Sequence, residues 1–423
     1  MAIISFFKKF LFIFLIGFSI FIFLNYISFL FAPVTCWKLG YTLCADQGED
    51  FYSLYQAAFN FSKNLFIYQK PPPPFLVVPY YMPFKYFPLS PVIIGYPFLK
   101  ISSSVFDSYR FFLLLNILFY IFSFLGIFLL ASFFRKSLFE KIILFTFWFS
   151  FFPIVSDLRM GQFNLISALC FLLAFIFIVF DKKILASFSW FFSLLFKPLT
   201  FFNFFYFLKN RNKIAIFLFG LNLAFTLIYF LYYYFLDPSS FQNIFKIYNL
   251  FSSQRVGWQI HYPDNFSVHS FLGEIFYDKF PLIFKIFSLT FKIVLILIFL
   301  FLTFKLKFNR NNQKIEYYYL LYSFLTPVIV YPEVWESWLA IYSVILALLF
   351  ILLETYKEKI FIFINYLLLA TPSFYYFYQK TKSPFWRFLL IGEKAVPQLL
   401  IYMYLTYLLF KFLHTQNYKK MIK

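Results

Sequence analysis

The sequence predicts an all-α polytopic membrane protein that forms a single integral membrane domain over residues 1–423. Of its 423 residues, 62% are hydrophobic and only 13% are charged, and the mean hydropathy is +0.78. Apolar runs of roughly 20 residues, the length at which a helix crosses a bilayer, recur along the whole chain. The chain therefore has little room for a soluble domain.

The basic residues indicate the orientation of the chain and exclude nucleic acid as a partner. The formal net charge is +20, but Lys and Arg stand mostly in short connectors between apolar runs, as the positive-inside rule predicts. Arg135, Lys136 and Lys141 form one such connector. This pattern predicts a multi-pass protein of the plasma (inner) membrane with both termini in the cytoplasm.

The same assignment of connectors predicts about twelve transmembrane helices. The first, Phe10–Phe31, is longer than the core of a signal peptide, so we expect it to be retained. Ile184–Phe196 and Leu199–Leu208 are too short to cross alone, and we expect them to turn at the outer boundary around Lys197-Pro198. The other predicted spans are Arg110–Phe134, Ile142–Val155, Leu165–Phe180, Ile214–Leu236, Pro281–Phe304, Tyr317–Tyr331, Trp335–Leu353, Ile360–Phe377 and Pro397–Leu413.

Two longer stretches are predicted on the outer face, namely a first external loop over residues 32–109 and a second over residues 237–280. Within the first loop, Pro79–Phe106 is apolar but repeatedly interrupted by proline. A straight spanning helix is unfavourable there, so we expect interfacial helices that lie on the membrane. Phe51, Leu54, Tyr55 and Ala58 share one helical face of the Phe51–Phe61 segment, and we expect this face to dock on the membrane surface. Cys36 and Cys44 share this loop and could form a disulfide if that side is oxidising, or remain free thiols.

Scarce polar residues collect on this same outer face. The chain has only 17 Asp and Glu residues, and ionisable groups at a membrane edge are functional candidates. The residues are Asp46, Glu49, Asp50, Arg159, Gly161, Gln162, Asn164, Lys197, Pro198, Asn265, Ser267, His269 and Glu336. Their convergence from separate loops predicts a single outer site.

Several of these residues also have a purely structural explanation. Gln162 and Asn164 could cap the helix that begins near them. Lys197 could extend to the lipid headgroups. Glu336 could belong to an aromatic belt, and His269 could be a solvated loop residue.

The sequence indicates no required cofactor. The three histidines are His261, His269 and His414, and they lack the paired helical spacing of a zinc site. Asp46 and Asp50 could hold a weak divalent cation. No Gly-rich phosphate loop is present, so we do not expect a soluble nucleotide donor.

Short motifs follow one another in a characteristic order between residues 50 and 340. They are Asp50-Phe51-Tyr52-Ser53-Leu54-Tyr55-Gln56-Ala57, Tyr68, Tyr86-Phe87-Pro88, Gly161-Gln162-Phe163-Asn164, Lys197-Pro198 and Asn265-Phe266-Ser267. In this order the chain resembles glycosyltransferase family 87, whose members have the GT-C fold and use polyprenyl-phosphate-mannose. The segment Pro332–Trp338 departs from the family pattern because it holds no histidine.

The resemblance implies an enzyme that moves a sugar, mannose in the family, from a polyprenyl-phosphate donor to a lipid or glycan hydroxyl on the outer face, with inversion. We expect Asp50 to be the general base, although it could be only a helix N-cap. Lys197 and Arg159 are expected to bind the donor phosphate, with Arg255 and Arg387 in reserve. The expected sugar or acceptor contacts are Gln162, Asn164, Asn265, Ser267, His269 and Glu336.

Two other functions stay open on the sequence alone. A polytopic lipid or solute transporter could carry the same outward polar cluster, and a lipid-linked oligosaccharide polymerase or ligase could share the substrate. The lack of an evident internal repeat and the one-sided placement of polar residues favour the transferase. A structure that gathers Asp50, Gln162 and Lys197 around one site would support it.

Overall fold

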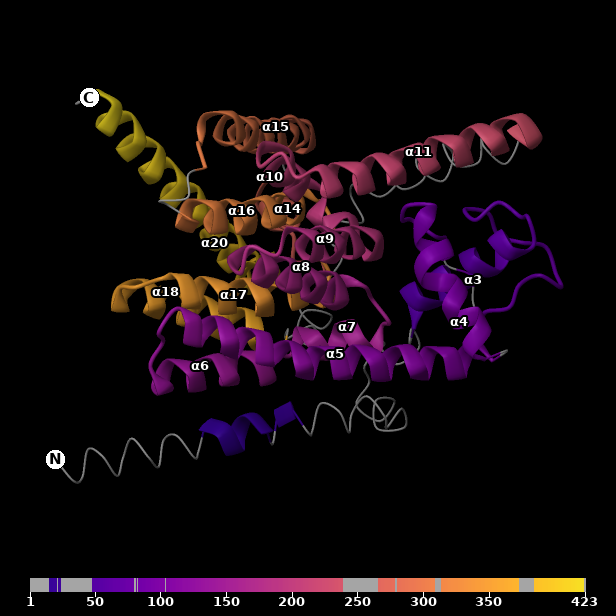
Figure 1. Cartoon of the computed structure of the whole chain (residues 1–423), viewed down its shortest axis with the longest axis horizontal. Coiled ribbons are helices and arrows are strands. Elements are labelled where there is room, and N and C mark those ends of the chain that lie inside the picture. Colours follow the sequence, from indigo (N-terminus) through magenta and orange to yellow (C-terminus); the bar gives the residue numbers. More distant parts are fainter. Residues whose placement is uncertain are drawn as a thin grey trace.

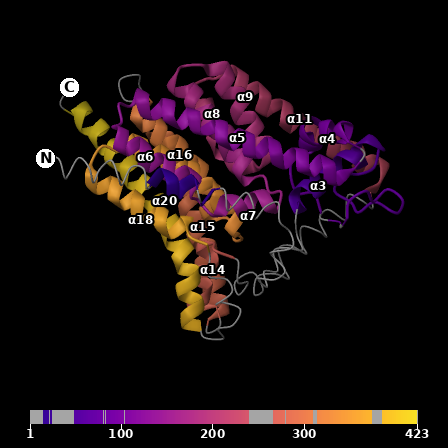
Figure 2. The same ribbon diagram turned by 90° about the horizontal axis from the view of Figure 1, so that it is seen from below.

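The computed structural model describes residues 15–20, 22–23, 48–79, 81, 83–102, 104–238, 265–277, 280–308, 313–372 and 384–421, and within these ranges the chain is helical with no strand. Figures 1 and 2 show a bundle of packed helices. The predicted first span Phe10–Phe31, Cys36 and Cys44 lie wholly or mostly outside these ranges. The prediction of an all-α membrane protein is confirmed.

Five of the described helical segments are long and apolar enough to cross a membrane. They are Val105–Phe133, Leu138–Arg159, Lys213–Leu236, Pro281–Lys305 and Phe385–Thr415. The expectation of about twelve spans and of a GT-C fold stays a prediction.

The helices follow one another along the chain in this order. They are α3 (Glu49–Ser62), α4 (Tyr96–Ile101), α5 (Val105–Phe133), α6 (Leu138–Phe149), α7 (Pro153–Arg159), α8 (Asn164–Val179), α9 (Lys183–Phe196), α10 (Phe204–Lys209), α11 (Lys213–Leu236), α14 (Val268–Phe276), α15 (Pro281–Lys305), α16 (Gln313–Val330), α17 (Ile341–Leu352), α18 (Tyr356–Ala370) and α20 (Pro384–Met421). Short turns of other helix types cover Pro91–Gly95, Pro198–Asn203 and Glu336–Ala340.

The core of the bundle surrounds α17. All twelve residues of this helix are buried, and its sequence, IYSVILALLFIL, is apolar on every side. A helix that is apolar all round belongs inside a protein or in lipid. Because α17 is too short to cross a bilayer alone, packing against α6, α8 and α18 explains its composition.

The chain breaks at Lys197-Pro198, as the sequence predicts. Helix α9 ends at Phe196, and a 3-10 turn then leads into α10. Proline disfavours helical geometry in the residue before it, and Lys197 is accordingly extended, with φ −156° and ψ 134°. The Nε1 of Trp190 donates to the carbonyl of Thr200 at 2.9 Å, which folds the turn back on α9. The side chain of Lys197 therefore projects from an extended residue between two helical segments, and the folded turn fixes the position of this residue.

The first external loop holds helices, as expected, but α3 does not rest on a membrane surface. The face predicted to dock there, which includes Phe51, Leu54 and Ala58, is buried by protein. It packs against the Pro91–Gly95 turn, α4 and α5. A Cβ on Gly95 would stand 2.8 Å from the Cβ of Ala58, so the two segments approach closely. The apolar periodicity revealed the buried face, and its partner is protein rather than lipid.

The α5–α6 turn lies at the end of the bundle opposite to α3 and α4 (Figure 1). There Lys359 of α18 pairs with Glu140 of α6 at 2.5 Å, and the Nζ of Lys136 donates to the carbonyl of Leu353 at 2.8 Å. These contacts fasten α6 and the α5–α6 turn to the α17–α18 connection.

Candidate functional site

Asp50 stands in the first turn of α3, where the helix dipole favours a charged carboxylate. The N-cap of α3 is Gly48, in a left-handed conformation with φ 81° and no side-chain cap. The alternative that Asp50 is only an N-cap is therefore wrong. Its Oδ2 instead accepts a hydrogen bond of 2.6 Å from the hydroxyl of Tyr86.

The turn between α7 and α8 brings together several predicted residues. Arg159, expected on the outer face, lies on α7 with Asp157, and both are buried. Asp157 accepts hydrogen bonds from the Nδ2 of Asn164 at 2.8 Å and from the backbone N–H of Leu165 at 3.2 Å. Asp157, rather than Gln162 or Asn164, therefore supplies the acceptor at the start of α8.

Lys197 is buried within protein and does not extend to the lipid headgroups. Its Nζ lies 3.3 Å from the Oε1 of Gln162 and 4.1 Å from the ring centroid of Trp338. Burial lowers the pKa of Lys197 to about 8, while the charges of Asp50 and Asp157 act in the opposite direction. A buried lysine with a lowered pKa beside two carboxyl groups is a candidate functional residue.

The start of α3, which carries Asp50, is hydrogen-bonded to the end of α7. The backbone N–H of Gly48 donates to the carbonyl of Arg159 at 3.2 Å, and the hydroxyl of Tyr109 donates to the same carbonyl at 2.7 Å. Gly161, with φ 60°, touches Gly48 so closely that a Cβ there would stand 2.9 Å from the Cα of Gly48.

These contacts gather five side chains, which we call the Asp50 cluster. They are Asp50, Tyr86, Asp157, Gln162 and Lys197. The structure thus brings Asp50, Gln162 and Lys197 together, as the transferase interpretation requires. Sequence reasoning did not assign Tyr86, Asp157 or Trp338 to the site. Tyr86 and Trp338 reach it from segments far along the chain, whereas Asp157 binds the nearby Asn164 and Leu165.

Asn265 and Ser267 form hydrogen bonds that join the start of α14 to the backbone of residues 332–334. The Nδ2 of Asn265 donates to the carbonyl of Pro332 at 2.9 Å, and its Oδ1 accepts from the backbone N–H of Val334 at 3.0 Å. The hydroxyl of Ser267 donates to the carbonyl of Pro332 at 2.8 Å and caps α14. Both side chains bind the 332–334 segment, and their expected contact with sugar stays a prediction.

His269 is a helical residue of α14 rather than a solvated loop residue. Its Nδ1 lies 2.5 Å from the hydroxyl of Ser288, and its ring packs on Phe284 at 4.9 Å. Burial lowers the pKa of His269 to about 3, so the ring is neutral.

Of two further candidates, Glu336 lies near α20 and Arg387 is part of it. Glu336 is buried in the turn before α17, within electrostatic range of Lys394. Arg387 lies 3.5 Å from Glu274 of α14. Asp46, Arg255 and His261 lie outside the described residues, as does the side chain of Glu49. The possible weak cation site at Asp46 and Asp50 therefore stays a prediction.

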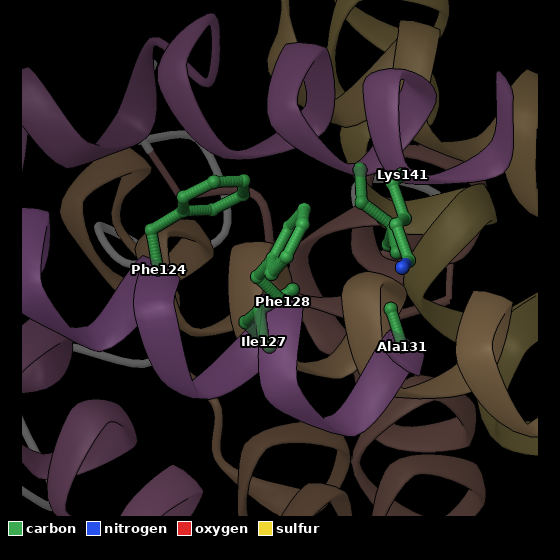
Figure 3. A pocket seen from close by; sticks show the side chains of 6 residues that line it. Phe124, Ile127, Phe128, Ala131 and Lys141 are labelled. Carbon is green, nitrogen blue, oxygen red and sulfur yellow. The ribbon is translucent and has the colours of Figure 1, made fainter. Parts of the chain in front are cut away.

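A small apolar depression lies apart from the Asp50 cluster, between α5 and α6 (Figure 3). Its lining residues are Phe124, Ile127, Phe128, Ala131, Lys141 and Leu144. The Nζ of Lys141 lies 4.7 Å from the ring centroid of Phe128. Lys141 carries the only polar side chain among these lining residues.

In the described part of the chain, an all-helical fold brings a carboxylate and a buried lysine into one cluster, the groups that glycosyl transfer from a phosphate-linked donor could use. The model of glycosyltransferase family 87 matches residues 72–326, and the chain belongs to this family. The matched range includes Tyr86, Gln162 and Lys197, whereas Asp50 precedes it. No curated protein and no solved structure matches the chain significantly.

Proposed function

We propose that this glycosyltransferase moves mannose from a polyprenyl-phosphate donor to the hydroxyl of a lipid or glycan acceptor. The observation that carries the proposal is the Asp50 cluster, in which a carboxylate fixed by Tyr86 shares one site with the buried cation of Lys197. A lipid-linked donor brings its own membrane anchor, which suits a protein whose helices are mostly apolar.

The proposed chemistry is a single displacement at the anomeric carbon. The acceptor oxygen forms a bond to this carbon while its proton passes to the carboxylate of Asp50. The bond from the anomeric carbon to the phosphate oxygen breaks, and its electron pair leaves with polyprenyl phosphate. Lys197 and Arg159 offset the negative charge gained by the phosphate. Attack opposite to the leaving group inverts the configuration, and the step requires no cofactor.

The sugar hydroxyls are proposed to contact Gln162 and Asn164. The Oε1 of Gln162 already faces Lys197, so a sugar bound there would lie beside the phosphate. The Oδ1 of Asn164 has no hydrogen-bond partner among the described residues, and it could accept from a hydroxyl group. We place this site on the outer face of the inner membrane, with both termini in the cytoplasm, from the basic connectors.

The test uses purified full-length protein with radiolabelled polyprenyl-phosphate sugars and a membrane-lipid extract. We expect label to move from the mannose donor in the wild type. Asp50→Asn should lower transfer by roughly 100- to 10,000-fold while thermal stability and donor binding are kept, because Asn still accepts from Tyr86. Asp107→Asn is the matched control, since Asp107 also lies in the first turn of a helix, exposed and paired with Arg110.

Near-wild-type transfer by Asp50→Asn would refute the role of Asp50 as the general base. Label that moves only from donors other than mannose would refute the assigned sugar and leave the base in place. If the protein carried lipid or solute across vesicles without forming a new glycosidic bond, the transporter alternative would hold instead.

A further inference from the structure

Tyr86 is held from three sides at the edge of the Asp50 cluster. Its ring packs against Phe84 and Phe163, each with a centroid distance of 5.5 Å. Its backbone carbonyl accepts a hydrogen bond of 2.7 Å from the hydroxyl of Tyr68. The position of the Tyr86 hydroxyl is therefore set by packing and does not depend on Asp50.

The Tyr86 hydroxyl donates to one oxygen of Asp50. The distance to Oδ2 is 2.6 Å, typical of a hydroxyl that bonds to a charged carboxylate. Burial, followed by the charge of Asp50, holds the pKa of Tyr86 well above its usual value, so the hydroxyl keeps its proton. The Oδ1 of Asp50 accepts no hydrogen bond from the described residues and is available to an acceptor hydroxyl.

We propose that Tyr86 is a positioning residue, whose hydroxyl binds Oδ2 of Asp50 and so presents Oδ1 to the acceptor. The proposal rests on the proposed role of Asp50 as the base. It assigns a function to the tyrosine of the Tyr86-Phe87-Pro88 motif. A carboxylate can rotate about the bond to its Cβ, and a donor fixed by packing removes that freedom at the helix start.

Lys197, which follows α9, and Asp157 of α7 interact electrostatically with Asp50, and Lys85 interacts with Lys197. All three residues stay in place when Tyr86 changes. Any shift in the titration of Asp50 caused by a change at Tyr86 thus reports the lost hydrogen bond.

The test compares Tyr86→Phe with Tyr55→Phe in the mannose-transfer assay, in the presence of a chelator. Tyr55 lies on α3 and donates to the carbonyl of Ser102 at 3.3 Å, away from Asp50. For Tyr86→Phe we expect kcat to fall about tenfold or more, with donor KM and melting temperature unchanged. The acidic limb of the kcat/KM profile should move up by about 1 pH unit, because the charged carboxylate has lost a donor. Tyr55→Phe should leave the limb in place.

An unmoved acidic limb in Tyr86→Phe would overturn the proposal, and so would a rise in donor KM with kcat unchanged, which would make Tyr86 a donor contact. A second measurement does not depend on catalysis. The carboxyl band of Asp50, identified by its loss in Asp50→Asn, can be titrated by infrared difference spectroscopy. Tyr86→Phe should raise its midpoint by about 1 pH unit. This result stands even if Asp50 proves not to be the base, so the two proposals fail separately.

Discussion

Gly161→Ala should displace the start of α3, which carries Asp50, from the end of α7. Gly161 has φ 60°, and its added Cβ would stand 2.9 Å from the Cα of Gly48 and 3.0 Å from the ring of Tyr109. The nearest atom is backbone, which cannot rotate away as a flexible side chain can. Relief therefore requires that Gly48 and Gly161 separate.

The cost of this substitution has two parts. A side chain in the left-handed region costs about 1–2 kcal/mol, and overpacking of a tight contact costs about 1–3 kcal/mol. Together they amount to about 2–5 kcal/mol, enough to break the 3.2 Å hydrogen bond from Gly48 to Arg159. Because Asp50 follows Gly48 by two residues, its carboxylate should move, and a misplacement of about 1 Å can lower a rate by about 100-fold.

The assay is thermal unfolding in detergent together with mannose transfer. Gly161→Ala should lower the melting temperature by several degrees and kcat by about 10- to 100-fold. Gly220→Ala is the control, because Gly220 lies in α11 and a Cβ there would meet nothing within 4 Å. A Gly161→Ala protein with the stability and kcat of the wild type would show that the close contact between Gly48 and Gly161 does not set the position of Asp50.

Two further predictions concern charged groups at opposite ends of the bundle. Burial gives Lys197 a pKa of about 8, so its cation is lost as pH rises through about 8. We expect kcat/KM for the donor to fall above that pH. Lys197→Arg should abolish this fall, since a guanidinium stays charged. The same fall in both proteins would refute the role of Lys197 in binding the donor phosphate. At the other end, Glu140 and Lys359 pair at 2.5 Å with little exposure. A double-mutant cycle of Glu140→Gln and Lys359→Met, measured by unfolding, should show a coupling energy on the order of 1 kcal/mol. Additive effects would show that this ion pair does not stabilise the packing of α6 on α18.

Local chemistry explains which parts of the fold the sequence could predict. Proline acts on its own neighbour, so the break at Lys197-Pro198 was predictable to the residue. The apolar spacing of Phe51, Leu54 and Ala58 predicted a helix with one buried face. Periodicity reveals a face but not its partner, and the expectation that this face rests on lipid was therefore wrong.

The site divides in the same way. Asp50, Gln162 and Lys197 were predictable as scarce polar residues beside helix ends. The Tyr86 hydroxyl that reaches Asp50 comes from 36 residues away, and Trp338, beneath Lys197, comes from still farther. Such contacts depend on tertiary packing, which no local pattern contains. The same holds for Asn265, whose amide binds the backbone of Pro332 and Val334, while its expected contact with sugar stays a prediction.

Tyr68 joins α11, a candidate membrane span, to the residue that we propose positions Asp50. Tyr68 stacks on Phe230 of α11 with centroids 5.7 Å apart and donates to the carbonyl of Tyr86. Most of the spanning part of α11 is not covered by the described protein, and a lipid-facing helix changes its tilt as the hydrocarbon thickness changes. If Tyr86 positions Asp50 as proposed, we expect acyl-chain length to alter turnover without any change in the donor or acceptor.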